Sequence, residues 1–386
     1  MDPFEINVDE LLLRPWQAGD AEAVYRACQD PDIQRWTTVP RPYERHHAVE
    51  FVTDYTDRAW SKGTGAPMGV FEAATGMLLG SMGLRLDLLA GEAEIGYWTV
   101  PAARGRGIAT RAGRALARWA LDGLGIRRLV WRAAIGNHAS RLAALRIGVQ
   151  IEGVQRARLA APGGGFIDGW IGALLSGDVL NSTPAWLASG SPAARQAATF
   201  AASQSRLALP AGGTSGSLRP VSPRDADTRL AIFQDPQTVR WASVPVAGYT
   251  REKLVAGDRE AERLWLVGEG AVFTIADADD ECVGLANLGI YPTRQLPDTA
   301  EVGFSMAPYA RNHGYATAAL RTLADWGIDA LGLSRIVWRA QVGNEASRRV
   351  AEKAGFTYEG IARTAWKQRD EHRDVWVASL VPTDRR

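Results

Sequence analysis

Hydrophobic and polar positions along the chain form blocks that predict the same order of elements twice. In the first half, an apolar run at 11–13 predicts a short strand, and helical periodicity follows over 20–29 and again over 44–60. Further strands are expected at 67–74, 78–86, 92–100, 129–134, 149–159 and 166–175, and further helices at 107–121 and 139–145. This β-α-α-β-β-β-α-β-α-β-β order predicts an α/β (α+β) fold with a mixed central sheet flanked by helices.

Individual residues repeat together with the pattern. Arg14-Pro15 recurs 205 positions later as Arg219-Pro220, and the Asn137-to-Ser140 segment recurs 207 positions later as Asn344 to Ser347. Other matching pairs are Asp30-Pro31 and Asp235-Pro236, Val39-Pro40 and Val244-Pro245, Trp131-Arg132 and Trp338-Arg339, and Asp168 and Asp374. An offset that drifts by only two residues indicates two homologous domains in tandem, because the period is far too long for a solenoid repeat.

The domain boundaries follow from a change in composition. Residues 181–216 are rich in Ala, Ser, Gly and Pro and end in Gly212-Gly213-Thr-Ser-Gly216, which is typical of a linker. We therefore expect an N-terminal domain at 1–180, a linker at 181–216 and a C-terminal domain at 217–386. A helix within 192–205 is expected to pack on one domain.

Composition excludes several classes of partner. A net charge of +1 argues against nucleic-acid binding, and no run of 18 apolar residues predicts a membrane span. The two cysteines, Cys28 and Cys282, fall at non-matching positions and the N-terminus lacks a signal layout, so a cytoplasmic protein without disulfides is expected. The five histidines lack metal-ligand spacing, so no metal site is expected.

The most informative repeated segment runs from Glu94 to Thr110 and again from Glu301 to Thr317. Each copy is a short strand that ends in Pro, followed by a Gly-containing turn and an Ala-rich helix start. Such a turn aims several backbone N–H groups and the positive end of a helix at one point, where a phosphate group binds well. A solvated Gly-rich turn is the alternative, and its duplication in matching context disfavours it.

These residues resemble the GCN5-related N-acetyltransferase (GNAT) superfamily. Its Arg/Gln-x-x-Gly-x-Gly/Ala signature stands here as Arg104-Gly-Arg-Gly-Ile-Ala109 and as Arg311-Asn-His-Gly-Tyr-Ala316. Asn344 to Phe356 is similar to the family's next motif, and Glu359 to Asp374 resembles the branch that acetylates N-termini of ribosomal proteins. The resemblance implies two tandem GNAT-fold domains that use acetyl-CoA as acetyl donor.

The resemblance also implies the residues that hold the coenzyme. The loops would bind the diphosphate, and the fourth strand would pair with the pantetheine arm. An amide at Val100 or Ala307, or at the neighbouring Thr99 or Met306, would face the thioester oxygen. The residues are Thr99, Val100, Arg104, Gly105, Arg106, Gly107, Ala109, Thr110 and Asn137 in the first copy. In the second copy they are Met306, Ala307, Arg311, Asn312, Gly314, Ala316, Thr317 and Asn344. The alternative role of Asn137 and Asn344 is to cap the following helix.

Acyl transfer to an amine needs one group to take up a proton and another to protonate the departing thiolate. By resemblance, Ser140 and Ser347 are the candidates to contact the sulfur, and Glu94 and Glu301 are the candidate bases. Their alternatives are a helix-surface serine and a solvent-facing strand carboxylate. Trp36 and Trp241 are candidates for lining the acceptor site, or else belong to the core.

The two copies are unequally preserved. The first has the more typical loop but an eroded second motif, whereas the second keeps that motif and carries Asn312 and His313 in its loop. We expect an N-acetyltransferase in which at least the C-terminal site is active, and the N-terminal copy is either a second active site or a structural domain. The acceptor is expected to be a primary amine, either a small amine or antibiotic, or a protein N-terminus. The alternative is a non-catalytic acyl-CoA-binding sensor or scaffold protein. A monomer is expected, because an internal duplication often mimics a homodimer.

Overall fold

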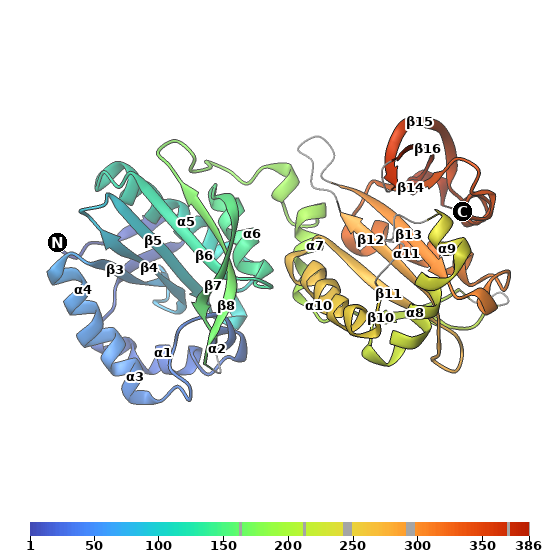
Figure 1. Cartoon of the computed structure of the whole chain (residues 1–386). Helices are drawn as coiled ribbons and strands as arrows, with labels where there is room; N and C mark the ends of the chain where they lie inside the picture. The colour runs from blue at the N-terminus through green and yellow to red at the C-terminus, as the bar shows by residue number, and fades with distance from the viewer. Residues whose placement is uncertain (162–163, 211–213, 242–248, 291–297, 369–370, 386) are drawn as a thin grey trace. The chain divides into compact units, whose positions relative to one another are not determined.

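The computed structural model describes residues 1–161, 164–210, 214–241, 249–290, 298–368 and 371–385. The chain divides into two compact units, Met1–Ala188 and Ser189–Arg386 (Figure 1). The segment 181–216 is therefore shared between the units. Val244-Pro245 and the linker residues Gly212-Gly213 lie outside the described residues.

The N-terminal unit contains fourteen labelled helices and strands within its described residues. In order they are β1 (Ile6–Val8), β2 (Leu11–Pro15), α1 (Ala21–Ala27), α2 (Pro31–Trp36), α3 (Arg45–Glu50), α4 (Thr56–Lys62), β3 (Gly65–Glu72), β4 (Leu78–Asp87), β5 (Glu92–Thr99), α5 (Ile108–Arg118), β6 (Arg128–Ala134), α6 (His138–Ile147), β7 (Gln150–Ala160) and β8 (Phe166–Leu174).

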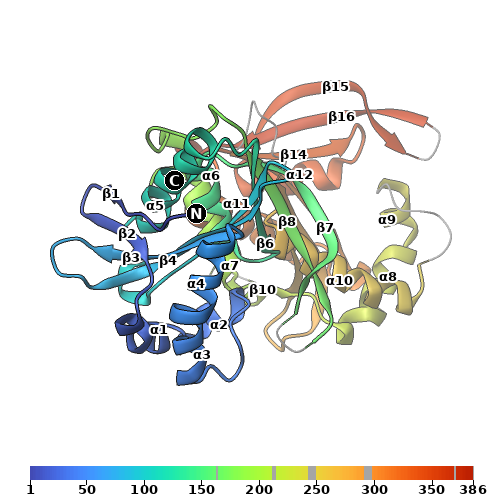
Figure 2. The same cartoon turned by 90° about the vertical axis from the view of Figure 1, so that its left-hand side faces the viewer.

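The strands form one mixed sheet in the order β1-β2-β3-β4-β5-β6-β8-β7, in which β5 and β6 are parallel. Successive strand residues point to opposite faces, so Val70 packs into a core with α5 whereas Phe71 packs into a second core with α1–α3. Figure 2 shows α5 and α6 on one side of β1–β4 and α1–α3 on the other. The predicted mixed sheet with helices on its faces is confirmed.

The C-terminal unit begins with an additional helix and then repeats this order, with one long helix where the N-terminal unit has α3 and α4. Its elements are α7 (Pro192–Ala201), β9 (Leu207–Ala208), β10 (Ser217–Pro220), α8 (Ala226–Gln234), α9 (Pro236–Trp241), α10 (Arg251–Val267), β11 (Gly270–Ala276), β12 (Cys282–Ile290), β13 (Thr299–Met306), α11 (Tyr315–Leu331), β14 (Arg335–Gln341), α12 (Glu345–Ala354), β15 (Thr357–Gln368) and β16 (Glu371–Leu380). The sheet order is β15-β16-β14-β13-β12-β11-β10-β9, with β13 and β14 parallel.

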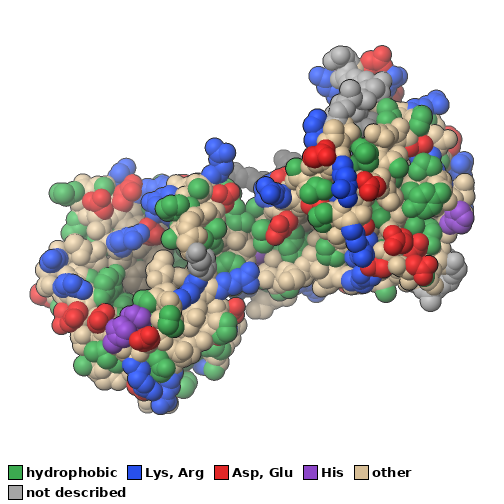
Figure 3. Space-filling view, turned by 60° about the horizontal axis from the view of Figure 1, so that its bottom comes forward, with side chains coloured by type: hydrophobic (Ala, Val, Ile, Leu, Met, Phe, Trp, Pro, Cys, Tyr) green, Lys and Arg blue, Asp and Glu red, His purple; other side chains and the backbone are tan. Residues whose placement is uncertain are grey.

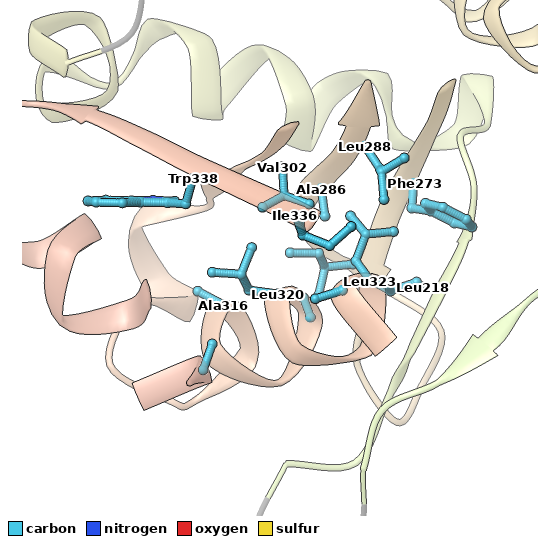
Figure 4. Packing of buried hydrophobic residues seen from close by; sticks show 14 of the residues in the cluster. Leu218, Phe273, Ala286, Leu288, Val302, Ala316, Leu320, Leu323, Ile336 and Trp338 are labelled. Carbon is cyan, nitrogen blue, oxygen red and sulfur yellow. The ribbon is translucent and has the colours of Figure 1, made fainter. Parts of the chain in front are cut away.

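The core of this unit lies between the sheet and α11. Leu320 and Leu323 of α11 face Val302 and Ile336 of the central strands, and all four are almost fully buried (Figure 4). Phe200 of α7 joins the same core and packs edge-on against Trp265. The helix expected within 192–205 therefore packs on the C-terminal unit.

Three features differ from the expected elements. Strand β1 and helix α2 were not anticipated, because three residues and six residues are too short to show periodicity. The helix expected over 20–29 ends earlier, at Ala27, and the Asp30 carboxylate caps α2, accepting a hydrogen bond from the Ile33 amide at 2.9 Å. The predicted helix over 44–60 is broken into α3, a π-helical turn at Phe51–Tyr55, and α4.

The structure explains two repeated pairs. Arg14 forms an ion pair with Asp20 at 2.8 Å, and Arg219 forms the matching pair with Asp225 at 2.8 Å. The carboxylate of Asp374 accepts from the amide of Thr364, a residue with φ of 52° at a bulge in β15. The repeated residues therefore fix the start of each sheet and the shape of its last hairpin.

The face of the molecule drawn in Figure 3 carries positive and negative side chains closely mixed. On the drawn face, Lys and Arg side chains lie among Asp and Glu side chains without a large single-sign area (Figure 3). Within the described residues, no helix combines the length and apolar character that crossing a membrane requires.

Candidate active site

Each sheet opens at the same place. The parallel pairing of β5 with β6 ends at Ile95 opposite Trp131, although β5 continues to Thr99. The pairing of β13 with β14 likewise ends at Val302 opposite Trp338, although β13 continues to Met306. Within the described residues, the last residues of β5 and β13 therefore leave one edge of backbone without a ladder partner.

The loop that follows each strand has the same backbone shape in both units. Gly105 and Gly107 both have φ of 75°, and the matching residues Asn312 and Gly314 have φ of 64° and 86°. Asn is among the few non-glycine residues that enter this left-handed region readily. The replacement of glycine by Asn312 therefore preserves the loop.

The loop delivers unpaired amides to one point. The amide of Arg111 donates to the Gly107 carbonyl at 3.0 Å, and that of Ala318 donates to Gly314 at 3.0 Å, which starts each helix ladder. The amides of the preceding helical turn have no partner within the helix. Ala109, Thr110, Ala316 and Thr317 lie in these first turns, where the helix dipole also favours an anion.

The loop arginines are placed differently from the sequence expectation. Arg104 forms ion pairs with Asp30 and Asp32, and Arg311 pairs with Asp235 and also donates to the Gln237 side chain at 3.0 Å. Both guanidinium groups are thus neutralised by carboxylates at the start of α2 or α9. In this structure they tie the loop to the neighbouring helix rather than standing free for a phosphate group. Arg106 lies on the loop itself, 3.8 Å from Glu72.

We expect Asp235→Asn to weaken coenzyme binding at the C-terminal unit by about fivefold, or roughly 1 kcal/mol, because the loop loses a charge-assisted tie. Burial acts to raise the pKa of Asp235, but hydrogen bonds from Arg311 and Thr238 outweigh it and lower that pKa, as a firmly held carboxylate requires. Calorimetric titration with CoA measures the effect, and Asp30→Asn is the matched change in the N-terminal unit. Tighter binding in Asp235→Asn would instead mean that the released Arg311 contacts the phosphates.

The expected oxyanion donors need a correction. The amide of Val100 donates to the Leu79 carbonyl at 3.0 Å, and that of Ala307 donates to Val283 at 3.0 Å, so neither amide is available. Because N–H directions alternate along a strand, the amides of Thr99 and Met306 point away from that neighbour, toward the open edge. Of the residues expected to supply this donor, Val100 and Ala307 therefore have amides engaged within the sheet, whereas the amides of Thr99 and Met306 face the open edge.

The two candidate serines are held by tryptophans of the next strand. The Nε1–H of Trp131 donates to Ser140 Oγ at 3.2 Å, and that of Trp338 donates to Ser347 Oγ at 3.2 Å. Both tryptophan side chains are almost fully buried, so each serine hydroxyl is fixed in position. Their indole N–H groups explain why the Val-Trp-Arg segment recurs.

The N-terminal serine has a second partner. Ser140 Oγ lies 3.2 Å from the Tyr97 hydroxyl, which donates to the Ser140 carbonyl at 2.9 Å. Burial raises the pKa of Tyr97 to about 12, so this phenol keeps its proton. The matching residue in the C-terminal unit is Phe304, which has no hydroxyl. Among the described residues, Trp338 is the one side chain that bonds Ser347 Oγ, and the serine proton remains available.

The candidate bases also differ. Glu94 pairs with both Arg85 at 2.6 Å and Arg132 at 2.5 Å, whereas Glu301 pairs with Arg339 alone among the described residues. The residue opposite Glu301 on the neighbouring strand is Gly289, which has no side chain to add a second cation. Glu301 therefore keeps more of its oxygen lone pairs open.

The remaining candidates lie near these groups. Asn137 and Asn344 cap the following helices, accepting from the amides of Ser140 at 3.1 Å and Ser347 at 3.3 Å. A Cβ on Gly343 would lie 3.6 Å from Trp241, so that ring lies beside the turn that leads to Asn344. Trp36 ends α2, half-buried beneath the Arg35 guanidinium.

Sequence reasoning missed Tyr97, Trp131, Trp338 and the three arginines that pair with the glutamates. The sequence held part of the evidence for these residues, because Trp131-Arg132 and Trp338-Arg339 repeat and lie one strand away from Glu94 and Glu301. Cross-strand pairing, which the sequence does not state, was needed to assign them.

Both halves of the chain match a known protein family. A family model described as acetyltransferase (GNAT) domain matches residues 10–150 and again residues 217–357. The uncharacterized N-acetyltransferase YoaA of Bacillus subtilis is 28% identical over 165 residues, which cover 42% of this chain and 92% of YoaA. The uncharacterized N-acetyltransferase p20 of Bacillus licheniformis is 26% identical over 169 residues, or 42% of this chain and 91% of p20. The structure of Mycobacterium smegmatis RimJ in complex with CoA-disulfide is 25% identical, with a TM-score of 0.42, over 47% of this chain and 87% of RimJ.

Proposed function

The chain belongs to the GNAT family of acetyl-CoA-dependent acetyltransferases as a tandem duplication, and on that premise we propose that its C-terminal unit transfers the acetyl group to a primary amine. The acceptor is a small amine, an aminated antibiotic or the N-terminus of a protein. Ser347, Glu301 and the Met306 amide carry the chemistry in this proposal.

The described residues fit acetyl-CoA, which supplies an acetyl thioester when bound. The unpaired amides of the first turn of α11, together with the left-handed loop at Asn312 and Gly314, suit a diphosphate. The open edge of β13 suits an extended amide-containing chain such as pantetheine, because it can form ladder hydrogen bonds there. The same fit holds for the loop at Gly105 and Gly107 in the N-terminal unit.

One observation carries the choice of the C-terminal unit, namely the number of partners at each serine. The proton of Ser140 is directed at Tyr97, whereas Ser347 accepts from Trp338 and keeps its own proton to donate. A hydroxyl held by a buried indole is well placed to hydrogen-bond a departing thiolate. The Met306 amide supplies a donor toward the open edge, where developing negative charge on a carbonyl oxygen is stabilised.

The acceptor amine loses a proton to Glu301, directly or through water. An α-amino group has a reference pKa of about 8, against about 10.4 for a lysine side chain, so an α-amine needs less help from a base. Arg339 holds the Glu301 carboxylate in place through an ion pair. The other carboxylate oxygen stays open to accept a proton. Glu301 is therefore the proton acceptor in our proposal.

A thiol-release assay with acetyl-CoA and a panel of amines and N-terminal peptides tests this proposal. We expect Ser347→Ala to lower kcat by about 100-fold, the usual size of a lost acid–base contribution, with CoA affinity unchanged. Ser140→Ala, the matched change, should reduce total turnover by less than twofold. The proposal fails if the two substitutions have equal effects, or if Ser347→Ala retains full turnover.

A further inference from the structure

One position on the strand face of the candidate base differs between the two units. The ladder between β13 and β14 ends at Val302 opposite Trp338, so Gly303 is the first β13 residue at the open edge. Val302 points into the core, and Gly303 therefore shares the opposite face with Glu301. Asn287 of β12 pairs with Gly303 across the ladder. Asn287 thus stands where the sheet opens.

The side chain of Asn287 lies on the face that carries Glu301. Its neighbours Ala286 and Leu288 are buried in the core on the other side of the sheet (Figure 4). The Asn287 Oδ1 atom lies 2.8 Å from the place where a Cβ on Gly303 would be, so the amide group covers this glycine. Asn287 is exposed, and both the N–H donors and the carbonyl acceptor of its side chain can reach a ligand.

The Asn287 amide and the Glu301 carboxylate are close enough to hold one small molecule between them. They are diagonal neighbours on the two strands, and such pairs stand about 7–8 Å apart. The other two corners of this four-residue block are Gly289 and Gly303, which have no side chains. A ligand whose amine meets the carboxylate can therefore present its next polar group to the Asn287 amide.

The N-terminal unit has no amide at this place. Gly83 pairs with Gly96 there, and Arg85 pairs with Glu94. Open space surrounds Gly96 where a Cβ would be, and the Arg85 guanidinium bonds the Glu94 carboxylate at 2.6 Å. The matching block thus presents an ion pair and two glycines. The combination of a carboxylate with a side-chain amide is specific to the C-terminal unit.

We propose that Asn287 is a specificity-determining residue of the C-terminal unit, which selects acceptors that carry an amide group on the carbon bearing the amine. The inference rests on the proposed function, because it places that amine at Glu301. A side-chain amide both donates and accepts, so the carbonyl and the N–H of a ligand amide can each bond Asn287. An alkyl amine makes neither bond and leaves the polar groups of the site without a partner.

Two amines with the same branching of heavy atoms test this selection. Glycinamide carries the amide group, whereas isobutylamine has methyl groups in its place. The thiol-release assay gives kcat/KM for each amine, and the ratio of the two is compared between the parent protein and Asn287→Leu, so that the different pKa values of the amines cancel. We expect the substitution to lower the glycinamide-to-isobutylamine ratio about tenfold, the size expected for the loss of one or two hydrogen bonds between neutral groups.

Two further variants separate recognition from a change in folding. Asn287→Gly installs the residue of the N-terminal unit and should lower the ratio as Asn287→Leu does, without adding apolar surface. Asn7→Leu is the matched control, because Asn7 is an exposed asparagine on the edge strand β1, away from the Glu94 and Glu301 faces. It should leave the ratio unchanged. A ratio that stays at the parent value in both Asn287 variants, or equal losses with both amines, overturns the inference.

A peptide that begins with glycine presents the same group as glycinamide. Its kcat/KM relative to isobutylamine should also fall about tenfold in Asn287→Leu, because the first peptide bond takes the place of the amide. Faster turnover of the peptide than of glycinamide in the parent protein supports the inference with a polypeptide N-terminus as the source. The reverse order supports it with a small amino amide as the source.

Failure of the inference is distinguishable from failure of the proposed function. Product from both amines with an unchanged ratio in the Asn287 variants refutes the inference alone. If no amine yields product, acetyl transfer is refuted, and ligand-observed NMR of the full chain with CoA still compares the binding of glycinamide and isobutylamine. A binding preference for glycinamide that disappears in Asn287→Leu then supports the recognition, and equal binding of the two amines overturns it.

Discussion

Replacing Gly314 by valine is expected to weaken CoA binding at the C-terminal unit by about 100-fold or more. Gly314 has φ of 86°, a region that a β-branched residue enters only at a cost of about 1–3 kcal/mol. The new Cβ would also lie 2.8 Å from the Thr214 hydroxyl, which donates to the His313 carbonyl at 2.9 Å. The loop must shift, and the N–H groups of the first turn of α11 then no longer point toward one phosphate position.

Calorimetric titration of the full chain with CoA measures this change. If both loops bind the coenzyme, Gly314→Val and the matched Gly107→Val should each reduce the stoichiometry from two toward one, because each unit has its own loop. Gly268→Val is the control for strain alone, since Gly268 ends α10 with φ of 76° and lies outside the loop. Normal CoA affinity in both loop variants would show that the coenzyme binds elsewhere.

Removing the charge of Arg219 is expected to destabilise the C-terminal unit by about 3–5 kcal/mol. Its side chain is 5% exposed and that of Asp225 is 3% exposed, and a buried carboxylate left without its cation is costly. The Asp225 carboxylate also accepts a hydrogen bond from the Thr274 hydroxyl at 2.8 Å, so it cannot rotate toward solvent when the arginine is removed. Urea denaturation of Arg219→Met, followed by tryptophan fluorescence, measures the loss as a change in the free energy of unfolding.

The matched change Arg14→Met should cost less, because the Arg14 and Asp20 side chains are 16% and 12% exposed and water screens the remaining charge. The double variant Arg219→Met, Asp225→Leu should recover part of the loss, since it leaves no unpaired charge. A loss in Arg219→Met no larger than that in Arg14→Met would contradict the buried-pair account.

The difference in unfolding free energy between the parent protein and Arg219→Met should also depend on pH, in a direction that the pKa of Asp225 determines. Burial acts to raise the pKa of Asp225, but hydrogen bonds from Arg219 and Thr274 outweigh it, so that pKa is lowered in the folded state. The stability from this group is therefore complete above the unfolded pKa of about 3.9 and is lost as pH falls below it. The gap between the parent protein and Arg219→Met should consequently narrow below about pH 4.

The glycine-containing loop after β5 and β13, and the caps of the helices that follow β6 and β14, could be predicted from local sequence. Gly107 and Gly314 mark left-handed turns before Ala-rich helices, and Asn137 and Asn344 stand where a helix cap is favoured, because these preferences act within a few residues. Arg104 and Arg311 were located on the correct loop, yet their partners Asp30 and Asp235 come from a helix more than 70 positions away. No local pattern reports that pairing.

The sequence by itself determined the duplication, the order of elements and the family, since repeated spacing and hydrophobic periodicity are properties of the linear chain. Only the tertiary structure decided which amides face the open strand edge, because N–H direction depends on register with the neighbouring strand. It also decided that Ser140 meets Tyr97 while Ser347 does not, and that Trp98 stacks on Trp16. These contacts join residues far apart in the chain, so they exist only once the sheet and helices have packed.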